Sequence, residues 1–338
     1  MSANPQRSVV TNWSEILRTQ NLAGHGPIDL VSRWLLITRA SVFTMTITSG
    51  LIGGLLAVGT PGADWGLFSL ALLGLVIAHA ANNMINDYFD LEGGVDTDGY
   101  ARTLYAPHPI LSNLISKQGL LAAIAISNLV DLAILAVIAS VRGWGVVGFA
   151  LAGLFISVFY VAPPLKLKHR GLGEPGVAIV WGPLMIGGTY LVTTGLIPAW
   201  VLLASLPYAL LVTTVLIGKH VDKHDSDKAK GIHTLPVLMG TDLSLTVNCW
   251  LMGLFFVTTV VMALAGVVSI WCLVVLLALP RLRETIAIYR KPPPESAPEG
   301  YPIWPLWYVV WAFRLNRLAG GLFIAGLVLG ALVPVDLY

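Results

Sequence analysis

Acidic side chains gather in two short segments of the sequence, and the first of them has the composition of a metal site. Five of the 18 acidic residues lie between positions 87 and 98. Asn86 and Asp90 are four residues apart, so they share one face if this segment is helical. Gly93 and Gly94 would then break the helix and turn Asp96 back toward that face. Mg2+ prefers carboxylate and amide oxygens and commonly bridges to substrate phosphates. The pattern suits a Mg2+–diphosphate complex, and a solvated acidic loop is the alternative.

The second segment holds three acids between positions 222 and 227. Asp222 and Asp225 are three residues apart and can share a helix face, although the lysines interleaved with them could pair with them at the surface. The stretch between the two segments carries three cations, and these could donate to phosphate oxygens or simply mark the cytoplasmic side: Lys166, Lys168 and Arg170.

The composition indicates the setting in which these residues act. Of the 338 residues, 56% are hydrophobic and only 11% are charged, whereas a soluble domain carries about 25% charged residues. The mean hydropathy is +0.78. These values exclude a soluble enzyme, a disordered regulator and a nucleic-acid-binding protein. Cys249 and Cys272 both lie in apolar stretches, so neither a disulfide framework nor a CxxC metal site is expected.

Apolar runs between charged or Pro/Gly-rich breaks predict an all-α membrane protein with nine transmembrane helices. A spanning helix needs about 20 apolar residues. The segment 301–316 is rich in Trp and Tyr and is predicted to be an interfacial helix that leads into the last span. The expected spans are residues 35–58, 66–86, 118–140, 144–163, 176–196, 199–218, 244–265, 267–280 and 318–335.

The basic residues predict the orientation. With the N-terminus in the cytoplasm and nine spans, 18 of the 20 Lys and Arg fall in cytoplasmic segments, as the positive-inside rule requires. The C-terminus then lies on the opposite side, and we expect a bacterial-type inner membrane. Asp131 sits midway along the third expected span and needs a partner or a cavity. Arg39, in the first span, is the candidate partner, and the alternative is that it points at the lipid substrate.

Three motifs resemble the UbiA superfamily of intramembrane prenyltransferases, and within it the menaquinone-pathway branch that prenylates 1,4-dihydroxy-2-naphthoate. The segment from Tyr160 to Glu174 is similar to the branch's YTxPPxKLKYRGLGE, and the segment from Asp227 to Leu235 is similar to its DxxxGxxTL. The branch's NDYxDxxxGxD is filled by Asn86, Asp87, Tyr88, Asp90, Gly94 and Asp96. Together with the count of nine spans, these three well-spaced motifs extend the resemblance over most of the chain.

The resemblance implies a bundle around a central cavity, capped by cytoplasmic loops, that transfers a polyprenyl group from its diphosphate to an aromatic acceptor. Asp87 or Asp225 would be the general base, and Tyr160 would steer the allylic carbon. The implied Mg2+ ligands are Asn86, Asp90, Asp96, Asp222 and Asp227. The implied diphosphate-binding cations are Lys166, Lys168, Arg170, Lys219 and Arg102.

The second acidic segment departs from the family's NxxxDxxxD signature, since no two of its acids are four residues apart. Aligning Asp227 puts Lys219 and Lys223 at the earlier positions. Either the helix carries a one-residue insertion or this half of the metal site is altered. We expect an insertion that presents Asp222 and Asp227 or Asp225, with His220 or Lys219 in place of the Asn, and the presence of a second Mg2+ stays open. The departure also leaves room for a non-aromatic acceptor or terpene cyclisation.

A secondary transporter is less favoured, because both acidic segments lie at helix ends and not at mid-membrane. We expect one domain over residues 34–338 after a cytoplasmic segment 1–33. The sequence indicates neither the acceptor, the prenyl length nor the oligomeric state.

Overall fold

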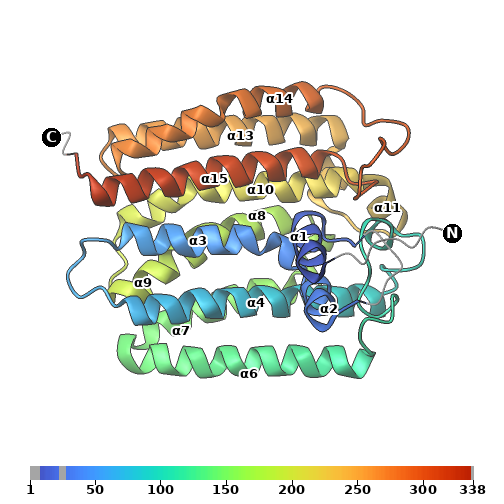
Figure 1. Cartoon of the computed structure of the whole chain (residues 1–338), viewed down its shortest axis with the longest axis horizontal. Coiled ribbons are helices and arrows are strands. Elements are labelled where there is room, and N and C mark those ends of the chain that lie inside the picture. The colour runs from blue at the N-terminus through green and yellow to red at the C-terminus, as the bar shows by residue number, and fades with distance from the viewer. Residues whose placement is uncertain (1–7, 23–27, 336–338) are drawn as a thin grey trace.

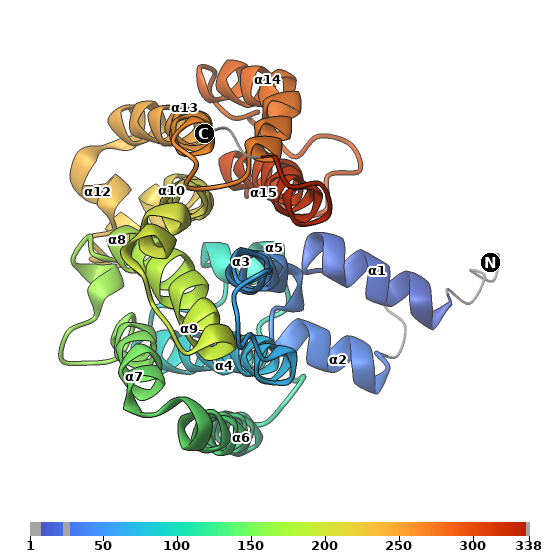
Figure 2. The ribbon, with the colours of Figure 1, turned by 90° about the vertical axis from the view of Figure 1, so that its left-hand side faces the viewer.

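The computed structural model describes residues 8–22 and 28–335, and these residues form helices and no β-strand. The long helices run side by side (Figure 1). Seen end-on, α13, α14 and α15 lie on one side of the bundle, and α4, α6 and α7 lie on the other (Figure 2). The segments α3, α8–α9 and α10 lie between them. The all-α prediction is confirmed.

Six helical segments are long and apolar enough to cross a membrane. A seventh is added if α2 (Leu30–Ile37) and the helical segment Ala40–Leu56, which includes α3 (Phe43–Leu56), form one span bent by 65°. The six are α4 (Trp65–Glu92), α6 (Lys117–Arg142), the α8–η3–α9 segment (Gly173–Thr194), α10 (Ala199–Asp222), α13 (Thr241–Leu264) and α15 (Tyr308–Leu332).

The count of nine is not confirmed, because two expected spans are short or irregular as helices. The first is α7 (Trp144–Phe159), with 16 residues. The second, expected at 267–280, is a 3-10 helix, η4 (Ile270–Ala278), that continues directly into α14 (Leu279–Tyr289). The shorter helices are α1 (Val9–Thr19), α5 (Ala101–Tyr105), η2 (Leu167–His169), α11 (His224–Ala229) and α12 (Leu235–Met239).

The prediction of a separate interfacial helix at 301–316 is wrong. α15 begins at Tyr308 and runs without interruption to Leu332, so its first turns belong to the same helix as the apolar run. Two arginines are tolerated there because each guanidinium packs on an aromatic ring of the same helix. Arg314 lies 4.7 Å from the Trp311 ring centroid, and Arg317 lies 4.4 Å from that of Phe313.

The first span begins at Leu30, before the expected position 35, and bends where Arg39 adopts left-handed backbone angles with φ 55°. α4 holds this bend in place: Asn83 Nδ2 donates to the carbonyl oxygen of Thr38 at 2.9 Å, and Arg39 pairs with Asp87. α2 therefore crosses the expected boundary between segments 1–33 and 34–338.

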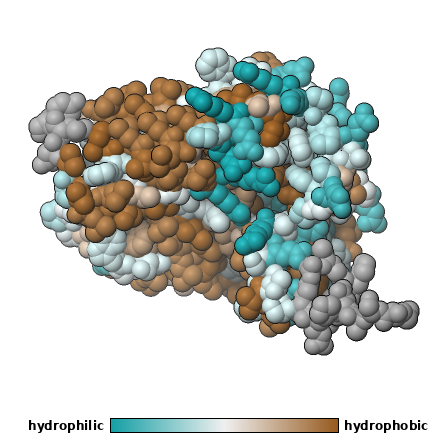
Figure 3. Space-filling model, turned by 45° about the horizontal axis from the view of Figure 1, so that its top comes forward, coloured by the Kyte–Doolittle hydropathy of each residue, from teal (hydrophilic) through white to brown (hydrophobic). Residues whose placement is uncertain are grey.

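Polar residues concentrate at one end of the face seen in Figure 3, and apolar residues cover most of the rest of that face. The polar end is the one that carries α11 and the start of the described chain (Figure 1). The main core lies among α10, α13, α15 and η4, where Tyr208, Phe255 and Phe323 are fully buried. This packing fixes α10, whose C-terminal end carries the second acidic segment.

α15 packs closely on η4 at Gly326. A Cβ atom there would lie 2.5 Å from Cys272 Cα and 2.7 Å from the Trp271 carbonyl oxygen. We expect Gly326→Ala to cost about 1–3 kcal/mol of unfolding free energy, because backbone must move to admit the methyl group. Thermal unfolding in detergent measures it. Gly321→Ala on the same helix is the control, since its Cβ would meet nothing within 4 Å. Equal midpoints for the two variants would contradict the prediction.

Candidate functional site

The last turns of α4 and the loop after it build one wall of a buried polar pocket. α4 ends at Glu92, and Gly94 adopts φ 69°. The backbone N–H groups of Val95 and Asp96 then both donate to the Asp90 carbonyl oxygen, at 2.8 and 3.0 Å. The chain thus folds back on the helix end, as the glycine pair predicted, and brings Asp96 beside Asp90.

The polar pocket brings together seven of the predicted site residues and four others. The four others are Arg39, Tyr105, His220 and Lys223. The predicted seven are Asn86, Asp90, Asp96, Arg102, Tyr160, Lys168 and Lys219. Two predicted cations lie outside this lining: Lys166, and Arg170, whose Nη2 donates to the Pro164 carbonyl oxygen at 3.1 Å.

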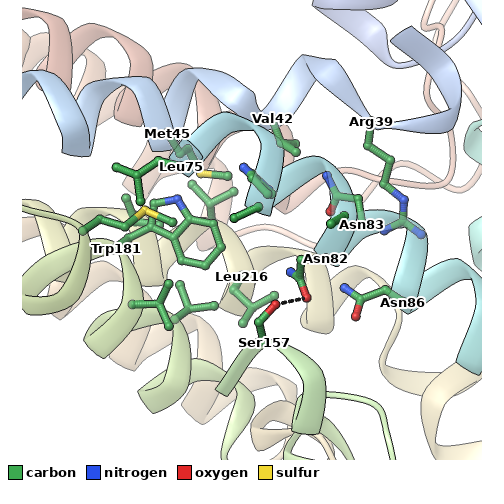
Figure 4. A pocket seen from close by; sticks show the side chains of 18 of the residues that line it. Arg39, Val42, Met45, Leu75, Asn82, Asn83, Asn86, Ser157, Trp181 and Leu216 are labelled. Atoms are coloured by element: carbon green, nitrogen blue, oxygen red, sulfur yellow. Dashed lines mark hydrogen bonds between the residues drawn. The ribbon is translucent and has the colours of Figure 1, made fainter. Parts of the chain in front are cut away.

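A larger cavity of about 890 Å3 adjoins the polar pocket, within the usual size range of ligand sites. Both are lined by Arg39, Asn86, Tyr105, Tyr160 and Lys219, so these residues mark the junction. In Figure 4, Arg39, Asn83 and Asn86 lie toward one end, and Met45, Leu75 and Trp181 toward the other. Asn82 lies between the two ends and accepts a hydrogen bond from Ser157 Oγ at 2.7 Å. The cavity therefore has a polar head and an apolar body.

Asp87 lies behind the pocket in a buried ion-pair network and not on its lining. It accepts hydrogen bonds from Arg39 and, at 3.2 Å, from Arg102 Nε. The expected pairing of Arg39 with Asp131 is therefore wrong. Asp131 instead lines the large cavity, and its Oδ1 is buried with no hydrogen-bond partner among the described residues. The two arginines favour a structural role for Asp87 over proton abstraction.

Three oxygen-bearing side chains on the α4 wall could hold a hard cation. Asn86 Oδ1 and Asp96 Oδ2 are buried and accept no hydrogen bond from any described residue, and Asp90 lies beside them, paired with Lys168 at 2.7 Å. Burial opposes ionisation of Asp96, yet His108, whose Nε2 lies 3.4 Å from Asp96 Oδ2, and the nearby Arg102 and Lys168 lower its pKa below the ordinary value. A buried, ionised carboxylate beside an amide oxygen fits Mg2+.

Asp87, Asp96 and His108 also bring ligand atoms within 4.8 Å of one another. A cation is disfavoured at that triad, because both oxygens of Asp87 already accept from guanidinium groups. The α4 wall of the pocket is therefore the better metal site.

The three acids of the second segment separate in the structure. Asp227 is buried, accepts a hydrogen bond from the Tyr100 hydroxyl, and pairs with Lys223 at 3.4 Å. Burial raises the pKa of Asp227, but the nearby Lys223 and His220 lower it by more. The pKa of Asp227 therefore lies below its ordinary value. The Asp225 side chain is fully exposed, and its one ion-pair partner among the described residues is its neighbour His224. The exposure gives no support to Asp225 as the general base.

The side chain of Asp222, the last residue of α10, contacts the start of α15 and does not line the pocket. Its two carboxylate oxygens accept from the backbone N–H groups of Tyr308, at 2.8 Å, and Val309, at 3.0 Å. A helix N-terminus leaves such N–H groups without partners, and a carboxylate there is favourable. These contacts favour a capping role over metal binding.

We expect Asp222→Ala to lower the unfolding free energy by about 1–3 kcal/mol, because the variant leaves two partly buried N–H groups without an acceptor. Thermal unfolding of the detergent-solubilised protein measures the loss, and Mn2+ binding to the same preparation should be unchanged. Loss of Mn2+ binding from a variant with wild-type stability would contradict the capping role.

A buried chain of hydrogen-bonding groups leads from the pocket into the protein, and the sequence did not reveal it. The Glu174 and His220 side chains meet at 2.7 Å, between Oε1 and Nδ1. His220 Nε2 lies 3.5 Å from the Tyr160 hydroxyl. Glu174 and His220 are 46 positions apart, so no local spacing links them; only the membership of Glu174 in the Tyr160-to-Glu174 motif was a signal.

A helical bundle whose apolar cavity ends in a buried pocket of acids and cations defines a membrane-embedded protein that handles molecules with a charged head and an apolar body. The chain belongs to the UbiA prenyltransferase family, which its residues 46–306 match. It is therefore a prenyltransferase, and the family predicted from the three motifs is confirmed.

Similar proteins include the 1,4-dihydroxy-2-naphthoate octaprenyltransferase of Bacillus subtilis (strain 168). It is 24% identical over 252 residues, which cover 72% of this chain and 78% of the relative. The UbiA prenyltransferase domain-containing protein 1 of Danio rerio is 24% identical over 325 residues, which cover 91% of this chain and 88% of that protein. A solved UbiA homolog from Archaeoglobus fulgidus bound to GPP and Mg2+ has the same fold, with a TM-score of 0.57 at 17% identity over 88% of this chain and 99% of that chain.

Proposed function

We propose that this protein transfers a polyprenyl group from a polyprenyl diphosphate to an aromatic, quinone-precursor-like acceptor within the membrane. The observation that carries the proposal is the junction of a buried polar pocket with an apolar cavity of about 890 Å3. The diphosphate would lie in the pocket and the polyprenyl chain in the cavity. The B. subtilis relative, a naphthoate prenyltransferase by name, supports an aromatic acceptor.

The pocket has the groups that a departing diphosphate requires. Asn86, Asp90 and Asp96 would hold Mg2+, which supplies positive charge to the leaving group. The A. fulgidus homolog bound to GPP and Mg2+ supports this cofactor. Lys168 and Lys219 would donate to phosphate oxygens. The allylic C–O bond then breaks toward a diphosphate whose negative charge is already compensated.

The apolar cavity protects the allylic carbon after ionisation. Met45, Leu75, Trp181 and Leu216 line it and contact the bound chain in this proposal. Water at this point would convert the cation to an alcohol, so its exclusion favours attack by the acceptor ring. In this proposal the allylic cation forms beside the Tyr160 ring, which lines both the pocket and the cavity and stabilises the cation through its quadrupole.

The acceptor ring forms a C–C bond with the allylic carbon and must then lose a proton. Tyr160 and His220 provide a route for that proton away from the pocket. Glu174 lies against Nδ1 of His220, which keeps the proton on that nitrogen and leaves Nε2 free to accept. Glu174 is a positioning residue in this scheme.

The test is incubation of the purified protein with a polyprenyl diphosphate, Mg2+ and either 1,4-dihydroxy-2-naphthoate or a hydroxybenzoate. We expect a prenylated ring and one diphosphate released per product. A cyclic hydrocarbon formed without acceptor would instead establish terpene cyclisation. Ion-coupled uptake by proteoliposomes with no diphosphate release would establish transport, and either result would overturn the proposal.

We also propose that the polar end faces the cytoplasm, with the N-terminus on that side and the C-terminus on the other, in an inner membrane. The one cation assigned to the far side supports this. Arg142 donates to the carbonyl oxygens of Val192, at 2.8 Å, and Thr193, at 2.6 Å, so it has a structural partner there. Thiol labelling of single cysteines introduced at exposed positions on each end, in intact cells, tests the orientation.

A further inference from the structure

The two walls of the polar pocket offer opposite charges to a ligand. The α4 wall offers oxygens, because Asn86 Oδ1 and Asp96 Oδ2 are buried without hydrogen-bond partners among the described residues. The opposite wall, at the end of α10, offers cations and imidazole, from Lys219, His220 and Lys223.

The α10 wall has almost no carboxylate left for a metal ion. Asp222 uses both oxygens on the N–H groups at the start of α15, and Asp225 is fully exposed. Asp227 accepts from Tyr100 and pairs with Lys223, which leaves only its Oδ2 without a described partner. A hard dication takes several oxygen ligands. The ammonium group 3.4 Å from Asp227 would also repel it.

The two lysines of this wall differ in their present partners. Lys219 is half-buried at the junction of pocket and cavity and forms no ion pair with any described residue. Lys223 pairs with Asp227, and its ammonium lies 4.6 Å from the Tyr100 ring centroid. Both groups line the pocket, and an ammonium group is a compact charge that binds phosphate directly.

We propose that the pocket binds diphosphate with a single divalent cation, held by Asn86, Asp90 and Asp96, and that Lys219 and Lys223 supply the compensating charge on the α10 wall. The inference rests on the proposed function and specifies how its diphosphate is held. The departure of the second acidic segment is then a replacement of metal ligands by direct phosphate ligands, and not an insertion.

The stoichiometry of Mn2+ binding in the presence of inorganic pyrophosphate tests the inference on the unmodified protein. We expect one Mn2+ per chain by calorimetry and by electron paramagnetic resonance, without magnetic coupling between ions. Two Mn2+ per chain would overturn the inference and leave the proposed function intact. If one Mn2+ bound per chain but the protein transferred no prenyl group, the inference would stand and the proposed function would be overturned.

Variants test the two lysines separately. Lys219→Gln should weaken pyrophosphate binding about 10- to 100-fold, since a hydrogen bond to a charged group contributes about 1.5–3 kcal/mol, while Lys219→Arg should retain most of it. Lys223→Asp should raise the stoichiometry to two Mn2+. The control is Lys228→Ala, exposed on α11, which should change neither value. Unchanged pyrophosphate affinity in folded Lys219→Gln, or one Mn2+ in folded Lys223→Asp, would contradict the roles assigned to these residues.

Discussion

Replacement of Asp96 by Asn is expected to lower kcat/KM for prenyl transfer about 100-fold or more. The carboxylate is buried, ionised and part of the pocket lining, and its Oδ2 lies 3.4 Å from His108 Nε2 but accepts no hydrogen bond from a described residue. A metal ligand of this kind contributes several kcal/mol to stabilisation of the leaving group, and each 1.36 kcal/mol corresponds to a tenfold change in rate. Initial rates of diphosphate release at saturating Mg2+ measure the effect.

Asp98→Asn is the matched control for this result. Asp98 lies in the same loop but is exposed and does not line the pocket, so its replacement should leave the rate within about twofold, as a surface change away from the site usually does. If Asp96→Asn and Asp98→Asn gave the same rate, the metal site on the α4 wall would be wrong.

Replacement of Asp87 by Ala is expected to destabilise the protein by about 3–5 kcal/mol, because it leaves two buried guanidinium groups without their counter-charge. The Asp87 side chain is fully buried, and those of Arg39 and Arg102 are 11% and 3% exposed. Thermal unfolding in detergent, monitored by circular dichroism, measures the loss.

The exposed pair between Lys117 and Glu92 provides the comparison. Lys117 Nζ lies 2.8 Å from Glu92 Oε1, and the two side chains are 48% and 43% exposed. Such a pair contributes about 0–1 kcal/mol to stability. Glu92→Gln should therefore shift the unfolding midpoint only slightly. A small shift for Asp87→Ala, equal to that of Glu92→Gln, would show that the buried network does not hold the bend at Arg39 in place.

The first acidic wall could be predicted from the sequence because its determinants are local. Asn86 and Asp90 share a face through helix periodicity, and the glycines at 93 and 94 return Asp96 to it within four residues. The all-α class and the membrane setting followed from composition in the same way. Each of these features depends on neighbours in the chain.

The second wall could not be predicted in this way, because its contacts are distant in sequence. Asp222 finds its partners at Tyr308 and Val309, and Glu174 finds His220. Arg39 likewise pairs with Asp87 and not with Asp131, because the bend at Arg39 turns its side chain toward the end of α4. The spacing of acids within the segment carried no information about these partners.

Hydropathy alone also could not predict the number of spans. Apolar composition identifies a run but not its backbone geometry. The π-helical segment inside Gly173–Thr194, the 3-10 helix η4 and the bend between α2 and α3 all lie within apolar runs. Each departs from the uniform α-helix that apolar composition alone suggests.

The contact between Asp222 and the start of α15 has a mechanical consequence. It fastens α15, whose Val309, Val310 and Phe313 line the large cavity, to the helix end that carries Lys219 and Lys223. In the proposed function, the surface that contacts the hydrocarbon chain and the surface that contacts the phosphates are thus joined by two hydrogen bonds. We expect a shift of the α10 end on donor binding to move the start of α15 with it, which would couple the fit of the donor's head to the fit of its tail.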